Sequence, residues 1–187
     1  MDPAVEAWLA NSATGFLMRV GLKRGQTILD FGCNKGNYAG PAARVVGHSG
    51  KVYALDKDIE ALEKLGREVR KQGLRNIECR HVSENGRIPL PARCVDVVLL
   101  YDILHRGYFP EPEERIKMLK GLHRVLKTGG LLSLYPTHLK KYGMTFGRLL
   151  SEVEAVGFEL KAEARRRLIH DGSLTTGRLF SFIKRGR

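Results

Sequence analysis

The sequence has few cysteines, few aromatic residues and no long apolar run. Its 187 residues include only three Cys, and no two of them form a Cys-x-x-Cys pair, so neither a disulfide framework nor a cysteine zinc site is expected. No stretch of about 18 apolar residues is present. The N-terminal segment is acidic and interrupted by polar residues, so no secretory signal is expected either. These absences predict a cytoplasmic protein, and its length favours a single domain over residues 1–187.

Acidic residues are also in deficit, since the net charge is +12. Residues 161–187 contain eight Lys or Arg against two acidic residues. Such a patch can bind a polyanion such as RNA, because neutralisation of phosphates drives much of that binding. A solvated basic face that maintains solubility is the alternative. The low aromatic content, 7%, leaves few side chains to stack on bases.

Short apolar runs alternate with amphipathic segments along the chain. Strands are predicted at residues 27–31, 51–55, 76–81, 95–101 and 130–135, and helices at residues 37–46, 59–72 and 113–126. Parallel strands need a crossover connection, and a right-handed helix is the usual one. The order of elements therefore predicts a doubly wound, Rossmann-like α/β fold with a mostly parallel sheet.

The pattern of predicted elements changes in the C-terminal third of the sequence. A further helix is predicted within residues 145–158, and two strand-like runs, 159–169 and 177–185, follow it. The residues between these runs are rich in Gly, Asp, Ser and Thr, which is typical of a hairpin. We therefore expect an antiparallel hairpin at one edge of a seven-stranded sheet. The segment KTGG, residues 127–130, is predicted to end the helix that precedes the fifth strand.

A glycine-containing segment follows the first predicted strand and reads ILDFGCNKGN from Ile28 to Asn37. The loop after the first strand of an open parallel sheet is a usual place for a nucleotide to bind. Gly32 and Gly36 let the backbone approach a ligand, because no Cβ blocks it. Asn34 stands where a further glycine would be expected, and Asn is among the few residues that tolerate a left-handed backbone.

Two acidic residues limit the chemical class of ligand that this loop can bind. Asp56 ends the second predicted strand, where its carboxylate can accept both hydroxyls of a ribose. Asp30 would repel a pyrophosphate and suits a ligand that carries positive charge. No Gly-Lys-Ser or Gly-Lys-Thr triplet is present, which excludes a P-loop. An NAD(P)-dependent oxidoreductase and a nucleotide-binding module without catalysis stay open, although Gly-x-Gly-x-x-Gly is missing.

At this point the chain resembles a known family, the class I S-adenosylmethionine-dependent methyltransferases, in particular the small-molecule branch of the ubiquinone/menaquinone-biosynthesis type. ILDFGCNKGN is similar to the first motif of the family, VYALDKD is similar to the second, and LHRVLKTGGLLSL resembles the helix and turn that lead into the fifth strand. VSENGRIPLPARCVDVVLL is similar to the segment before the fourth strand. The resemblance covers about residues 20–160.

The resemblance implies S-adenosylmethionine as the cofactor and S-adenosylhomocysteine as the product. Asp30 would meet the ammonium group, backbone amides around Gly32 the carboxylate, and Asp56 the ribose. Lys35 either reaches the carboxylate as well or points to solvent, and Glu84 takes the place of the acid that contacts the adenine amino group. The full set of expected cofactor contacts is Asp30, Gly32, Cys33, Asn34, Gly36, Asp56, Lys57, Glu84, Asn85 and Tyr101.

The end of the fourth predicted strand supplies the candidate catalytic residues Tyr101, Asp102 and His105. The reaction would be an in-line displacement at the sulfonium methyl, for which positioning and desolvation can suffice. If the acceptor arrives protonated, His105 is the candidate base, because the pKa of an imidazole can lie near neutral. Alternatively, Asp102 contacts the cofactor or caps a turn and His105 packs structurally. Tyr135 and His138 are further candidates, and no metal site is expected.

Several acceptors are disfavoured. No Asn-Pro-Pro or Asp-Pro-Pro run follows the fourth strand, which argues against methylation of base amino groups, and Cys94 precedes that strand, which argues against 5-methylcytosine formation. Residues 1–22 are expected to form a lid helix over the cofactor. Trp8, Phe16 and Leu17 would then contact the acceptor or pack in the core. The leading prediction is a methyltransferase acting on a small molecule, with RNA as the alternative acceptor and the oligomeric state open.

Overall fold

The computed structural model describes residues 2–82, 87–105 and 107–186. Its helices are α1 (Pro3–Asn11), α2 (Ala13–Val20), α3 (Ala39–Val46), α4 (Ile59–Lys71), α5 (Pro112–Val125), α6 (Phe146–Ala155) and the short 3-10 helix η1 (Lys140–Tyr142). Its strands are β1 (Thr27–Phe31), β2 (Lys51–Asp56), β3 (Ile77–His81), β4 (Val95–Tyr101), β5 (Leu126–Tyr135), β6 (Phe158–His170) and β7 (Ser173–Lys184).

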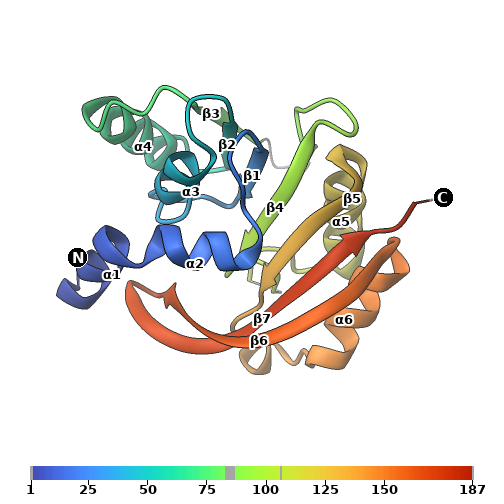
Figure 1. Cartoon of the computed structure of the whole chain (residues 1–187). Coiled ribbons are helices and arrows are strands. Elements are labelled where there is room, and N and C mark those ends of the chain that lie inside the picture. The colour runs from blue at the N-terminus through green and yellow to red at the C-terminus, as the bar shows by residue number, and fades with distance from the viewer. Residues whose placement is uncertain (1, 83–86, 106, 187) are drawn as a thin grey trace.

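All seven strands belong to one sheet with the order β3-β2-β1-β4-β5-β7-β6 (Figure 1). The pairs among β1 to β5 are parallel, whereas β7 runs antiparallel to both β5 and β6. This topology confirms the predicted doubly wound sheet with a C-terminal hairpin. The chain turns from one side of β1 to the other between β3 and β4, so ligands are expected at the carboxyl ends of β1 and β4.

Both faces of the sheet are covered, which explains why the central strands read as continuous apolar runs. In β4, Val98 and Leu100 belong to the apolar cluster that contains residues of α5 and α6. Val97 and Leu99 point to the other face, where the cluster contains residues of α2, α3 and α4. Because successive side chains of a strand point to opposite faces of the sheet, β4 contributes to the apolar cluster on each face.

Side-chain caps set the start of several helices. Asp58 Oδ1 accepts a hydrogen bond from the amide of Ala61 at 3.0 Å, and α4 begins directly after it. The hydroxyl of Thr145 accepts one from the amide of Arg148 at 3.2 Å at the start of α6. Both caps satisfy amides that have no partner within the helix.

The glycine pair of KTGG does not end a helix, and that prediction was wrong. Helix α5 ends at Val125, and β5 begins directly at Leu126. The pair lies within β5, where Gly129 has a positive φ of 72°. The register against β4 shifts at this point, between Val95 and Val97. The glycines therefore accommodate an irregularity between two paired strands, a role that sequence spacing cannot distinguish from a helix end.

The N-terminal segment forms two helices rather than one. Phe16 and Leu17 are buried together with Val5 in the apolar cluster beneath α2 and α3. The ring of Trp8 lies 5.6 Å from that of Phe16 and 6.1 Å from that of Tyr38. All three predicted acceptor contacts of this segment thus pack against the domain. Among the described helices, none has the length and apolar character to cross a membrane.

Candidate functional site

A cavity of about 710 Å³ opens at the carboxyl ends of β1, β2 and β4. Its walls come from the loop after β1, the turn after β2, the residues that follow β4, the first turns of α5 and the turn between β6 and β7. This is the place that the sheet topology predicts for a ligand.

The loop after β1 has the backbone that the sequence predicts. Gly32, Asn34 and Gly36 have φ values of 78°, 43° and 82°, which confirms that Asn34 adopts a left-handed conformation. A Cβ on Gly32 would lie 2.7 Å from the side chain of Ile103, and one on Gly36 would overlap Leu65. Larger residues at the two glycines would therefore meet both a strained φ and a filled space.

The amides of this loop already donate within the protein. The amides of Gly32 and Cys33 donate to the carbonyl of Leu55 at 2.8 and 3.1 Å. The amide of Asn34 donates to Asp56 Oδ2 at 2.7 Å. These bonds fix the loop against β2 and hold Asp56 at the cavity. They also leave these amides engaged, in contrast to the expectation that amides around Gly32 would meet the cofactor carboxylate.

Asp30 is the most unusual acid of the site. Its side chain is 3% exposed, it lines the cavity, and its Oδ2 is a buried oxygen with no hydrogen-bond partner among the described residues. Burial and the neighbouring carboxylate of Asp56 raise the pKa of Asp30 to about 7. A buried acceptor without a partner is costly, and a cationic ligand group would supply one. The site thus fits a cofactor that carries an ammonium group.

The other expected cofactor contacts divide into three groups. Cys33, Lys57 and Tyr101 line the cavity. Burial raises the pKa of the Cys33 thiol, so it stays protonated. Gly36 does not line the cavity and serves the turn instead. Glu84 and Asn85 lie outside the described residues.

Tyr101 and Asp102 lie at the end of β4 as predicted, and both have protein partners. The hydroxyl of Tyr101 shares a hydrogen bond of 2.8 Å with Ser133. Asp102 has a φ of 60° and accepts a hydrogen bond from the hydroxyl of Thr137. Its Oδ2 lies 2.6 Å from Nδ1 of His170. Asp102 therefore orients the imidazole of His170, which is the last residue of the edge strand β6.

His105, the predicted base, does not line the cavity. It is 5% exposed, and its ring stacks on Tyr142 at 4.9 Å between centroids. The amide of Gly107 donates to its Nδ1 at 3.0 Å. Burial and the nearby His138 lower the pKa of His105 to about 4. This arrangement matches the alternative in which His105 packs structurally.

Sequence analysis missed the contribution of the β6–β7 turn. Asp171 and Gly172 line the cavity, and His170 pairs with Asp102 beside them. The only signal in the sequence was a polar, turn-like segment between two strands. Its approach to β4 follows from the pairing of β7 with β5 and from the length of the hairpin, which a local pattern does not reveal.

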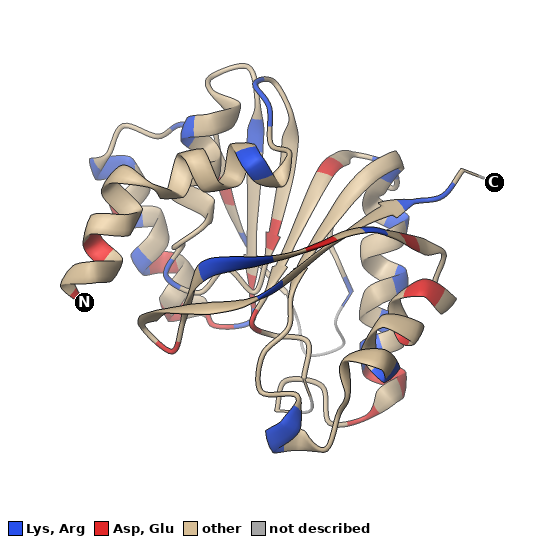
Figure 2. Ribbon diagram, turned by 60° about the horizontal axis from the view of Figure 1, so that its bottom comes forward, with Lys and Arg blue, Asp and Glu red and all other residues tan. Residues whose placement is uncertain are grey.

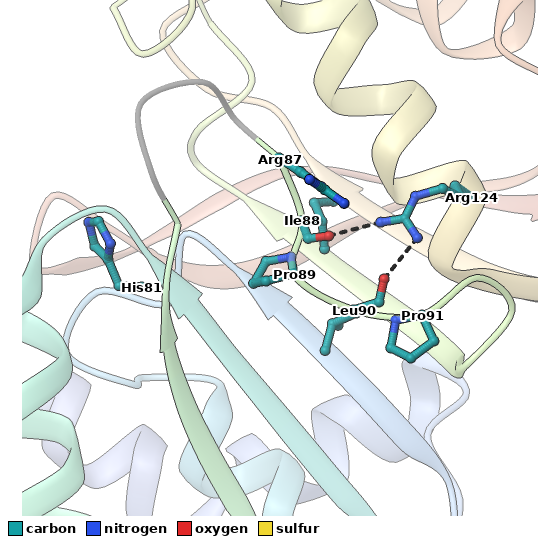
Figure 3. Close-up of a pocket in the computed structure, with 7 residues that line it drawn as sticks. All are labelled: His81, Arg87, Ile88, Pro89, Leu90, Pro91 and Arg124. Carbon is teal, nitrogen blue, oxygen red and sulfur yellow. Dashed lines mark hydrogen bonds between the residues drawn. The ribbon is translucent and has the colours of Figure 1, made fainter.

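A second pocket of about 550 Å³ lies between the segment before β4 and α5 (Figure 3). Figure 3 shows the guanidinium of Arg124 pointing to the carbonyls of Ile88 and Leu90, to which it donates at 2.8 Å each. These bonds hold the segment to the helix. Among the described residues its lining contains no carboxylate to match a cationic cofactor, so the larger of these two cavities is the candidate active site.

Comparison with known proteins agrees with this geometry. Residues 28–130 match the model of the family described as methyltransferase domain, which is more than half of the chain. A ubiquinone/menaquinone biosynthesis C-methyltransferase from Escherichia fergusonii is 35% identical over 117 residues. That match covers 60% of this chain and 43% of the relative, so the chain spans less than half the length of the relative that it matches.

Solved structures show the same fold over nearly the whole chain. A structure described as a SAM-dependent methyltransferase from Aquifex aeolicus has a TM-score of 0.76 and 26% identity, and the match covers 97% of this chain and 94% of that one. One from Methanosarcina mazei has a TM-score of 0.72 and 19% identity, with 90% and 97% covered. Given the seven-stranded sheet, the glycine loop and the matched domain, this chain belongs to the methyltransferase domain family and shares the fold of solved SAM-dependent methyltransferases.

Proposed function

We propose that this protein transfers the methyl group of S-adenosylmethionine to a small molecule bound in the same cavity. The unpartnered, buried Oδ2 of Asp30 beside the glycine loop carries this proposal. A pyrophosphate would be repelled there, whereas an amino-acid ammonium would supply the missing partner. When bound, S-adenosylmethionine supplies an electrophilic methyl group on its sulfonium.

Three side chains of the cavity match three of the polar groups of that cofactor. Asp30 faces the ammonium group, and Asp56 the ribose hydroxyls. Asp56 keeps acceptor capacity for hydroxyls, because its two backbone donors, Asn34 and Asp58, leave further lone pairs on its oxygens. Lys35 lines the cavity and faces the carboxylate, a role that the engaged amides of its loop cannot take. The adenine lies toward Leu55 and Val82, which form an apolar part of the wall.

The acceptor occupies the side of the cavity formed by Tyr108, Phe109 and the β6–β7 turn. Aromatic walls exclude water and fix the orientation of a small organic molecule. In this position the protein contributes alignment and desolvation to an in-line displacement. The relatives named as C-methyltransferases favour a carbon atom as the nucleophile.

RNA is the second candidate acceptor, favoured by Arg165, Arg166 and Arg167, which are exposed on the edge strand β6. Other charges of the hairpin are neutralised, since Arg178 makes a bidentate pair with Glu163 at 2.6 and 2.8 Å. Figure 2 shows Lys and Arg on the helices and on other strands as well as on the hairpin. The positive charge is thus spread over the molecule, and we rank the small molecule first.

The first test is calorimetric titration with S-adenosylhomocysteine, with NAD as the comparison ligand. We expect micromolar binding of S-adenosylhomocysteine, no binding of NAD, and at least a tenfold loss of affinity in Asp56→Ala, because a ribose hydrogen bond to a charged group is worth about 1.5–3 kcal/mol. Glu60→Gln, an exposed acid in the first turn of α4, is the matched control and should bind like the wild type. Equal affinity in Asp56→Ala and the wild type, or binding of NAD, would contradict the proposal.

A further inference from the structure

Two histidines and two aspartates meet beside the cavity. Asp102 follows β4, His138 follows β5, His170 ends β6, and Asp171 forms the turn into β7. One potential ligand atom from each of the four lies within 4.8 Å of the others. Three chain segments, far apart in the sequence, thus bring nitrogen and oxygen donors to one point.

Two of the distances among these atoms match the spacing of ligands around one ion. Asp171 Oδ2 lies 3.5 Å from Nε2 of His138 and 3.6 Å from Nε2 of His170. A tetrahedral ion with bonds of about 2.0–2.2 Å separates neighbouring ligand atoms by about 3.3–3.6 Å. Both histidines therefore present the same nitrogen to one carboxylate oxygen at the distance that a shared ion requires.

Asp102 has a different position in the cluster. Its Oδ2 lies 2.6 Å from Nδ1 of His170, which is the length of a hydrogen bond and too short for two ligands of one ion. In a neutral imidazole, a proton on Nδ1 that faces this carboxylate leaves the lone pair on Nε2, the nitrogen near Asp171. Carboxylates orient metal-binding histidines in this way.

The backbone at the cluster is unusual as well. Of the described residues, five other than glycine have a positive φ, and three of them belong to the cluster: Asp102 at 60°, His138 at 54° and Asp171 at 47°. Such conformations cost energy in residues that carry a Cβ. Here they aim three side chains from separate turns at one another.

We propose that His138, His170 and Asp171 bind a divalent transition-metal ion of the Zn²⁺ type, with Asp102 as the positioning residue for His170. Imidazole nitrogens favour such ions over Mg²⁺ and Ca²⁺, which prefer oxygen. Three protein ligands leave the fourth position of a tetrahedron for water or for a heteroatom of the acceptor. Asp102 and Asp171 line the cavity, so the ion would adjoin the acceptor space and tie the hairpin turn to the loops after β4 and β5.

Cobalt reports on this site directly, because four-coordinate Co²⁺ absorbs visible light much more strongly than the hydrated ion. The full chain, freed of metal with a chelator, is titrated with Co²⁺, and the bound ion is then displaced with Zn²⁺ or challenged with Mg²⁺. We expect strong visible bands that Zn²⁺ removes and Mg²⁺ leaves unchanged. We expect the affinity to fall at least 100-fold in His138→Ala and in His170→Gln, and about 10–100-fold in Asp102→Asn.

His81→Ala is the matched control, since it removes an exposed histidine of β3 outside the cluster and should leave the titration unchanged. Circular dichroism of each variant separates loss of metal from loss of fold. Equal Co²⁺ affinity in the wild type and in the double variant of His138 and His170, or only the weak bands of the hydrated ion, would overturn the proposal and leave an ion-pair network. Metal binding is measured without cofactor or acceptor, so that result would not bear on methyl transfer.

Discussion

Asp30 combines two properties at the scale of a single residue, namely burial and a carboxylate oxygen, Oδ2, that has no hydrogen-bond partner among the described residues. Its folded-state pKa of about 7 lies well above the ordinary value of 3.8. Between these two values the folded protein holds a proton that the unfolded chain has lost. The contribution of Asp30 to stability therefore falls as the pH rises through this range.

Replacing Asp30 with Asn should remove that pH dependence. In the protein without ligand we expect Asp30→Asn to be more stable than the wild type above pH 7, by about 2–4 kcal/mol, and to lose this advantage near pH 4. Urea unfolding of both proteins at several pH values measures the difference. Parallel stability curves for the two proteins would contradict the assignment.

The same variant should bind S-adenosylhomocysteine more weakly, because its amide carries no charge to pair with the ammonium group. The affinity of the wild type should rise with pH until Asp30 is ionised, whereas Asp30→Asn should lack that rise. Gain in stability and loss of affinity in one variant would show that the carboxylate serves the ligand at the expense of the fold.

Some residues of the site could be predicted from the sequence and others could not. The left-handed Asn34 follows from the local chemistry of its side chain, and the position of Asp56 follows from the end of an apolar run. His105 and His170 show the limit of prediction from the sequence. Both are histidines near polar turns, so the local pattern does not distinguish their positions in the fold. The pairing of β7 with β5 brings His170, rather than His105, to the carboxylate of Asp102.

At the scale of elements, α5 and α6 are joined by a buried ion pair. The guanidinium of Arg115 donates to both carboxylate oxygens of Glu152, at 3.0 and 3.1 Å, and its remaining nitrogen donates to the carbonyl of Phe109 at 3.1 Å. Arg115 is 1% exposed and Glu152 is 12% exposed. Phe109 lines the cavity, so this pair connects the packing of two helices to the acceptor wall.

Breaking this pair should destabilise the protein strongly. We expect Arg115→Met to lower the free energy of unfolding by about 3–5 kcal/mol, because Glu152 loses its buried bidentate partner and keeps only the exposed Arg148, at 3.5 Å. Arg185→Met is the matched control, since Arg185 is 63% exposed and lies 3.5 Å from Glu159. That exposed pair should contribute less than about 1 kcal/mol. Urea unfolding compares the two variants, and similar losses in both would contradict the role given to burial.

The boundaries of the elements were harder to predict than their order. The apolar runs of β1 and β4 appear at the expected places, because parallel strands buried on both faces leave a plain pattern. The role of the KTGG segment was predicted wrongly, since a glycine pair suits a helix end and a strand irregularity equally well. The division of the N-terminal segment at Ser12 depends on packing against α3 and has no comparable local signal.

At the scale of the whole molecule, the fold could be predicted from the alternation of strands and helices, while the acceptor could not. The alternation of strands and helices determines a parallel sheet covered by helices on both faces. This arrangement places the loop after β1 at the carboxyl edge of the sheet, where the cofactor is expected. The acceptor side of the cavity is built from α5 and from a hairpin turn, where no residue pattern has a fixed chemical meaning. The net charge of +12 is likewise a property of the molecule and does not identify a partner.

Salt dependence separates charge-driven RNA binding from recognition of an acceptor. We expect weak binding of a single-stranded RNA probe that falls steeply as the salt concentration rises. Replacing Arg165, Arg166 and Arg167 together with Gln should lower the slope of log affinity against log salt by about 2. The affinity for S-adenosylhomocysteine should stay unchanged. RNA binding that resists salt and tightens with S-adenosylhomocysteine would instead favour RNA as the acceptor.

The exposed arginines Arg165, Arg166 and Arg167 also lie on the edge strand of the sheet. Strand β6 ends the strand order and spans Phe158–His170, so one side of a long strand is left without a partner strand. Such an edge is a template on which another chain can add a strand and start aggregation. Charged side chains and the register shift between Leu160 and Ala162 work against that addition. The basic hairpin thus protects the solubility of the fold whether or not any polyanion binds to it.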